Sequence, residues 1–177
     1  MKNIILLPGN SIRNREWANM WATALRSKGF SVHMQQYDHW DTGAEFVDVF
    51  REVQKLNATA KVITGEYAIV AKSIGSFIAM EAIVSRTISP TQCVFFGVPF
   101  SILEKELSDS LPIIAQYTET KTLIFQNNGD PITPFSKIRN VFSGIKSISC
   151  VELVDNTHNY FVSDDLVERV SKELSHV

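Results

Sequence analysis

Cysteine is scarce in this chain, and long apolar runs and an excess of charge of either sign are absent. Only Cys93 and Cys150 occur among the 177 residues, both inside apolar stretches and without the paired spacing of a metal or redox motif. We therefore expect two buried free thiols, since free cysteine behaves as a small core residue. A disulfide or a metal site is the alternative that two cysteines leave open.

The charge balance leaves no basic field to attract a polyanion. Seventeen basic and nineteen acidic residues give a formal net charge of −2, so neither nucleic acid nor an anionic membrane surface is an expected partner. The apolar run at residues 4–7 stops at Pro8. It is too short for a signal peptide or a membrane span, which makes the cytoplasm the expected compartment.

A glycine-rich phosphate loop is also missing. After the first expected strand the chain reads Pro-Gly-Asn-Ser at residues 8–11, which has neither the GxGxxG pattern nor a P-loop lysine. This disfavours a nucleotide-binding protein. No repeat or low-complexity linker divides the chain, and 177 residues suit one domain, so we expect residues 1–177 to form a single domain.

Strand-like and helix-like stretches alternate from end to end. This order predicts an α/β protein with a mostly parallel sheet of about six strands and helices on both faces. The expected strands cover residues 4–7, 31–36, 67–71, 92–98, 122–126 and 147–153. The expected helices cover residues 16–27, 44–56, 134–142 and 164–174, with one more after residue 75 and a short one around 102–107.

The end of the third expected strand carries the main chemical signal. The segment Ala71-Lys72-Ser73-Ile74-Gly75 places a serine between small residues where a strand passes into a helix. This is the pattern of a nucleophile elbow. Small residues are needed two positions away because the strained turn brings the flanking backbones close together. Ser73 is either a nucleophile or simply the N-cap of the helix.

Two later loops offer the partners of such a serine in the chain order serine, acid, histidine. Asp130 follows the strand at 122–126, and His158 follows the last strand. Because imidazole exchanges protons near neutral pH, His158 is the expected base. Asp155 and Asp109 are rival acids, and Asp130 has a second interpretation as an aspartate that satisfies its own turn.

The other three histidines are poorer candidates for the base. His176 lies in the C-terminal tail and His33 lies within a strand. His39 follows the second strand, where it could line a pocket without acting as the base. An exposed surface histidine is the alternative for each.

Chemistry at a serine also needs two backbone N–H groups aimed at the oxygen that becomes negative. The N–H of Ile74, directly after the serine, is one candidate for this oxyanion hole. The loop after the first strand should supply the other, with Asn10 as the best candidate. Trp40, Phe100 and Phe135 are the aromatic side chains expected to line the substrate pocket, with core or surface packing as the alternative.

Together these motifs resemble the α/β-hydrolase superfamily, and in particular its small lidless serine hydrolases of the retinoblastoma-binding protein 9 type. The resemblance covers nearly the whole chain in the order of its elements. It is carried by Pro8-Gly9-Asn10, the elbow at residues 71–75, Gly129-Asp130-Pro131 and Thr157-His158-Asn159. It implies an α/β-hydrolase fold without a large lid, with Ser73 as nucleophile, Asp130 as acid and His158 as base.

This sequence departs from the family pattern at three positions. Ala71 replaces the usual glycine of the elbow, Thr157 replaces the glycine before the base, and Lys72 stands where many members have histidine. Alanine should fit the turn at modest strain. Lys72 is either solvated or favours an acidic substrate.

The expected function is therefore hydrolysis of a carboxylic ester or thioester through an acyl-enzyme, with no metal or organic cofactor. The expected partner is a small-molecule ester-like substrate. A non-catalytic protein of the same fold that binds a partner or a small ligand is the alternative, because a fold does not by itself confer an activity.

Overall fold

The computed structural model describes residues 2–101 and 120–175. Within these residues six strands form one sheet in the order β2-β1-β3-β4-β5-β6, and every neighbouring pair is parallel. The strands are β1 (Asn3–Leu7), β2 (Ser31–Met34), β3 (Tyr67–Lys72), β4 (Gln92–Phe96), β5 (Lys121–Asn127) and β6 (Ile148–Leu153). The α/β class predicted from the alternation of elements is confirmed.

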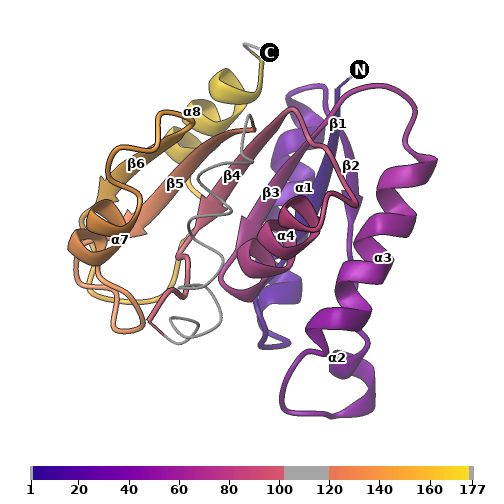
Figure 1. The fold of residues 1–177 in the computed structure, drawn as a ribbon, viewed down its shortest axis with the longest axis horizontal. Helices are drawn as coiled ribbons and strands as arrows, with labels where there is room; N and C mark the ends of the chain where they lie inside the picture. The colour runs from indigo at the N-terminus through magenta and orange to yellow at the C-terminus, as the bar shows by residue number, and fades with distance from the viewer. Residues whose placement is uncertain (1, 102–119, 176–177) are drawn as a thin grey trace.

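Helices cover both faces of the sheet (Figure 1). Helices α1 and α8 pack on one face, and α3, α4 and α7 pack on the other. The helices are α1 (Asn14–Ser27), α2 (His39–Thr42), α3 (Val49–Val62), α4 (Ile74–Val84), α7 (Phe135–Val141) and α8 (Asp164–Ser175). None of the described helices is long and apolar enough to cross a membrane.

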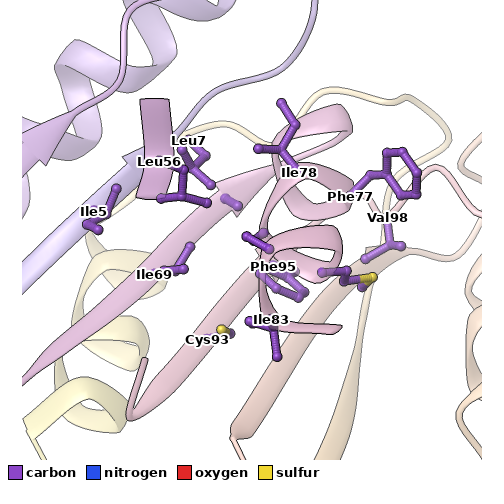
Figure 2. Packing of buried hydrophobic residues seen from close by; sticks show 14 of the residues in the cluster. Ile5, Leu7, Leu56, Ile69, Phe77, Ile78, Ile83, Cys93, Phe95 and Val98 are labelled. Carbon is purple, nitrogen blue, oxygen red and sulfur yellow. The ribbon is translucent and has the colours of Figure 1, made fainter. Parts of the chain in front are cut away.

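Alternation along the strands produces two apolar layers, one on each side of the sheet. In β3, Ile69 and Ala71 belong to the layer under α3 and α4, whereas Ala68 and Val70 belong to the layer under α1 and α8. Figure 2 shows the first layer, where side chains of β1, β3 and β4 meet those of α3 and α4. The same alternation directs Lys72, the last residue of β3, to the side of α1.

The segment between β2 and β3 differs from the prediction. Residues 39–42 form the short helix α2, which ends at Gly43 with a φ of 75°. The next helix begins at Val49 rather than at residue 44, because the Asp48 side chain caps it by accepting the Arg51 N–H at 3.1 Å. The apolar pattern was misleading here, since Phe46 lies before the helix and is 70% exposed.

The remaining predicted elements differ from the observed ones only by a few residues at their ends. Strand β4 stops at Phe96 rather than at residue 98, because Gly97 turns the chain with a φ of 61°. Both cysteines are free, but only Cys93 is buried. Cys150 is half-buried because it lies on β6, at the edge of the sheet. The short helix expected at 102–107 lies outside the described residues.

The strand order reverses at β1, since β2 is added on one side of β1 and β3 is added on the other side. In open parallel sheets, ligands bind at such a switch point, in the crevice outside the carboxyl ends of the strands. The loop with Asn10 leaves β1 at this place, and Ser73 leaves β3 beside it. The topology therefore brings the two predicted halves of the oxyanion hole to one edge.

Candidate active site

Ser73 occupies a strained turn between β3 and α4. Its φ of 52° and ψ of −122° are rare for a residue other than glycine. Its N–H donates to the carbonyl oxygen of Phe96 at 2.9 Å, and its own carbonyl accepts from the Ser76 N–H at 2.9 Å, which fixes the turn. The Ser73 side chain makes no capping hydrogen bond to α4, so the interpretation as a simple N-cap is wrong.

Gly75 allows this turn to lie directly against β1. A Cβ atom at position 75 would stand 2.5 Å from the carbonyl oxygen of Leu7 and 2.6 Å from that of Pro8. Both obstacles are backbone atoms, which cannot rotate away. Ala71, by contrast, is fully buried and its methyl group is part of the core under α4. The turn therefore requires glycine on its helix side and accepts alanine on its strand side.

His158 connects Ser73 with Asp130. Its Nε2 lies 2.9 Å from Ser73 Oγ, and its Nδ1 lies 2.7 Å from Asp130 Oδ2. A carboxylate can only accept, so Nδ1 carries the hydrogen and Nε2 is left to accept from the serine hydroxyl. The three side chains named from the sequence thus form one hydrogen-bonded chain.

Asp130 is held as a buried carboxylate, with only 2% of its surface exposed. Its Oδ1 accepts from the backbone N–H groups of Ile132 and Thr133 at 2.8 and 3.2 Å. Burial alone would raise the pKa of Asp130, but hydrogen bonds from His158 and Tyr160 outweigh it and keep the pKa below its usual value. The aspartate therefore satisfies its own turn with one oxygen and orients the imidazole with the other.

The rival groups that the structure describes do not reach this chain of hydrogen bonds. Asp155 accepts a backbone N–H of its own loop at 2.9 Å. His33 is on β2, where its Nε2 lies 3.2 Å from Asn3 Oδ1. Asp109 and His176 lie outside the described residues.

Tyr160 supports the site and was missed from the sequence. Its hydroxyl donates to Asp130 Oδ2 at 2.6 Å and accepts from the Asn127 N–H at 3.1 Å. Its ring packs edge-on against the imidazole of His158. Burial raises the pKa of Tyr160, and the neighbouring carboxylate adds to this, so the hydroxyl stays protonated. The available signal was a tyrosine two residues after the candidate base, since a buried tyrosine hydroxyl needs a polar partner.

Asn10 is anchored by both its side chain and its carbonyl group. The side chain accepts from the Val47 N–H and donates to the carbonyl oxygen of Glu45, both at 2.9 Å. The carbonyl oxygen of Asn10 accepts from His39 Nε2 and from Trp40 Nε1, both at 2.7 Å. His39 and Trp40 thus hold the loop after β1 in place.

The backbone N–H groups of Asn10 and Ile74 have no hydrogen-bond acceptor among the described residues. Ile74 is the first residue of α4, so its N–H has no acceptor within the helix. Two unpaired donors therefore stand at the positions expected for an oxyanion hole.

The three aromatic side chains expected to line the substrate pocket lie elsewhere. Trp40 and Phe100 are buried in the core under α3 and α4. Phe135 begins α7 and lines a separate hollow together with Arg139. Aromatic character near the sheet edge was a poor guide, because core packing uses the same residues.

A cavity of about 600 Å³ opens beside Ser73 and His158. It lies between α1, the loops after β1 and β3, and the loop that carries His158. Its apolar wall contains Met20, Phe161 and Val162, and its charged groups are Arg13, Glu16 and Lys72. No cluster of three or more His, Cys, Asp or Glu that could hold a metal ion occurs within residues 2–101 and 120–175.

Lys72 is buried in the wall of this cavity, with 7% of its surface exposed. Its Nζ donates to Asn14 Oδ1 at 2.8 Å and lies 5.6 Å from the centre of the Trp17 ring. Burial lowers the pKa of Lys72 to about 8, although the carboxylate of Asp130 acts in the opposite direction. The interpretation of Lys72 as a solvated surface residue is wrong.

A scan of protein-family models and a search of curated proteins found no match to this chain. Solved structures do match. An uncharacterized protein from Bacillus cereus is 15% identical with a TM-score of 0.81, and the match covers 99% of this chain but 60% of that one. A Xanthomonas campestris protein assigned to the α/β hydrolase superfamily is 16% identical with a TM-score of 0.74, over 99% and 98% of the two chains. A pyrethroid hydrolase from Sphingobium faniae is 12% identical with a TM-score of 0.71, also over 99% and 98%.

These similarities show the fold. The chain has the α/β-hydrolase fold, and its structural neighbours include hydrolases. The expected fold is confirmed, with no large lid among the described residues. The narrower resemblance to the retinoblastoma-binding protein 9 type stays a prediction.

Proposed function

We propose that this protein is a serine hydrolase that cleaves a carboxylic ester or thioester through an acyl-enzyme, as a single domain acting on a small-molecule substrate. The observation that carries the proposal is the continuous hydrogen-bonded chain from Ser73 through His158 to Asp130. A serine hydroxyl is a weak nucleophile unless an adjacent base accepts its proton, and here the base is in contact with it.

In the first half of the reaction, His158 Nε2 accepts the hydroxyl proton of Ser73 as Oγ attacks the substrate carbonyl carbon. The tetrahedral intermediate collapses when the bond to the alcohol or thiol breaks, and His158 returns the proton to that leaving group. Asp130 keeps the imidazole in the tautomer with hydrogen on Nδ1 and stabilises the imidazolium that forms.

In the second half, a water molecule gives a proton to His158 and attacks the acyl carbon. The bond to Ser73 Oγ then breaks, the serine recovers its proton from His158, and the carboxylic acid leaves. In both halves, the role proposed for the N–H groups of Asn10 and Ile74 is to donate to the oxygen that becomes negative. One such donor is typically worth about a hundredfold to a thousandfold in rate.

The experiment that tests this proposal is labelling with a fluorophosphonate probe, which reacts with an activated serine. We expect the wild-type protein to be labelled and Ser73→Ala to remain unlabelled. Ser85→Ala is the matched control, because Ser85 is an exposed serine at the other end of α4. Hydrolysis of p-nitrophenyl acetate should likewise fall strongly in His158→Ala.

A folded wild-type protein that stays unlabelled would contradict the proposal. The non-catalytic interpretation, a protein of this fold that binds a partner or a small ligand, would then take its place. Unchanged turnover in His158→Ala would assign the base to another residue.

A further inference from the structure

We propose that Lys72 selects esters that carry a free carboxylate, by binding that carboxylate in the cavity beside Ser73. The inference rests on the proposed hydrolase function and deepens it by naming a substrate class. It starts from an ammonium group that is buried, lines the cavity and has no carboxylate partner among the described residues.

The placement of Lys72 follows from the sheet. It is the last residue of β3 and therefore directly precedes the nucleophile. Strand alternation directs its side chain to the α1 side, above Val70, where the cavity lies. Lys72 and Ser73 line the same cavity, so a substrate that binds there with its carbonyl group at Ser73 lies close to this side chain.

The ammonium group of Lys72 is only partly satisfied. It has three N–H donors, and within the described residues it donates only to the neutral amide oxygen of Asn14. Glu16 lines the same cavity but forms no ion pair with it among the described groups. Because a buried charge is costly unless it is paired, the remaining donors favour a negatively charged ligand.

A second positive charge and an apolar wall define the rest of the ligand. Arg13 lines the same cavity and is exposed, and no described carboxylate pairs with it. Met20 and Phe161 lie on the apolar wall, and 48% and 71% of their surfaces are exposed. The cavity thus fits a short hydrocarbon segment that separates an ester from a carboxylate.

A purely structural role for Lys72 is the competing explanation, because its bond to Asn14 joins β3 to α1. A structural role predicts that replacement of Lys72 impairs charged and neutral substrates equally. Substrate selection predicts a change in the ratio between them. The ratio of kcat/KM values for an anionic ester and its neutral analogue therefore separates the two.

The test uses two matched substrate pairs near neutral pH. The acyl-side pair is mono-p-nitrophenyl adipate and its methyl ester, and the alcohol-side pair is p-acetoxybenzoate and its methyl ester. We expect the wild-type protein to prefer the anionic member of at least one pair. In Lys72→Met this preference should fall about 10- to 100-fold, the size of one lost charge-assisted hydrogen bond.

Two control variants make the result specific. Lys72→Arg keeps the positive charge and should retain a preference for the anionic ester. Lys61→Met removes the same type of charge from an exposed position on α3, outside the cavity, and should leave the ratio unchanged. Arg13→Gln should lower the ratio less than Lys72→Met, because Arg13 is exposed to solvent.

Failure of this inference can be distinguished from failure of the proposed function. If wild type hydrolyses neutral esters through Ser73 but Lys72→Met leaves the ratio unchanged in both pairs, the inference is overturned and the hydrolase stands. If no ester is hydrolysed, calorimetric titration of Ser73→Ala with p-acetoxybenzoate decides. If Ser73→Ala binds p-acetoxybenzoate and Ser73→Ala/Lys72→Met does not, the carboxylate site is supported. If Ser73→Ala does not bind this compound, the inference is overturned.

Discussion

Tyr160 and His158 donate hydrogen bonds to the same carboxylate oxygen of Asp130, at 2.6 and 2.7 Å. The other oxygen is held by two backbone N–H groups. The carboxylate therefore cannot rotate without breaking several hydrogen bonds at once. Its direction fixes the plane of the imidazole, and with it the approach of Nε2 to Ser73.

Replacing Tyr160 with phenylalanine should reduce kcat about tenfold and change KM little, because it loosens Asp130 but keeps the aromatic ring that borders the cavity. The Asn127 N–H would also lose its acceptor, so the free energy of unfolding should fall by about 1–2 kcal/mol. Steady-state kinetics and urea unfolding measure the two effects. Tyr67→Phe is the control, because the Tyr67 hydroxyl also accepts a backbone N–H, at 3.1 Å, far from the site. A loss of activity in both variants would contradict the supporting role of Tyr160.

Asp130→Asn should lower kcat about a thousandfold to ten-thousandfold, because an amide can stabilise the wrong tautomer of His158. Asp155→Asn should have little effect, since the Asp155 side chain accepts only the Thr157 N–H of its own loop among the described residues. The comparison of the two variants on p-nitrophenyl acetate tests which aspartate acts with the base. Equal losses in both would refute the assignment of Asp130.

Gly75→Ala should unfold the elbow or prevent folding, since the added methyl group would overlap the carbonyl oxygens of Leu7 and Pro8. Thermal unfolding and fluorophosphonate labelling report the two consequences. Gly29→Ala is the matched control: it also adds a methyl group, but nothing lies within 4 Å of that position. Only the strain of its φ of 88° remains there, about 1 kcal/mol. A Gly75→Ala protein as stable as Gly29→Ala would mean that the turn is placed differently.

The order of strands and helices was predictable because it depends on local patterns. Continuous apolar runs such as residues 93–96 mark strands buried on both faces, and the observed β4 is fully buried. The geometry of Ser73, Asp130 and His158 was also within reach, because all three follow strands, and the ends of parallel strands share one edge. Asp155 also lies between Ser73 and His158 in the chain, one strand later than expected for the acid, so the order alone left it as a rival until the contact between His158 and Asp130 was seen.

The surroundings of these groups were not predictable, because they depend on contacts between distant segments. Nothing local to Lys72 indicates that Asn14 and Trp17 enclose it. Trp40 was expected in the pocket, yet its indole bonds to the carbonyl oxygen of Asn10 and fixes the loop after β1. A side chain's type shows what it can bind, whereas its partner follows from the packing of α1 and α2 against the sheet.

Trp40→Phe should therefore impair catalysis through the oxyanion hole rather than through substrate binding. It removes one of the two hydrogen bonds that hold the carbonyl oxygen of Asn10. We expect kcat to fall about tenfold and KM to change little, because small displacements of an N–H donor weaken transition-state stabilisation. Trp21→Phe controls for loss of a buried indole, since its Nε1 makes no hydrogen bond. A rise in KM at constant kcat would instead place Trp40 in substrate binding.

Lys72→Met should increase stability near neutral pH, because it removes a buried charge that pairs with no carboxylate among residues 2–101 and 120–175. The pKa of Lys72 is about 8 in the folded protein, against 10.5 for the free side chain. Between these values the unfolded chain binds more protons than the folded one, so wild-type stability rises with pH across this window. Lys72→Met lacks this pH-dependent contribution. Its free energy of unfolding should exceed that of the wild type by about 2 kcal/mol at neutral pH, and the excess should shrink toward pH 10. Urea unfolding of both proteins across this range measures the difference, in which all other titrating groups cancel. A constant difference would show that the folded protein holds Lys72 at an ordinary pKa, and that the site does not keep an ammonium group at the expense of stability.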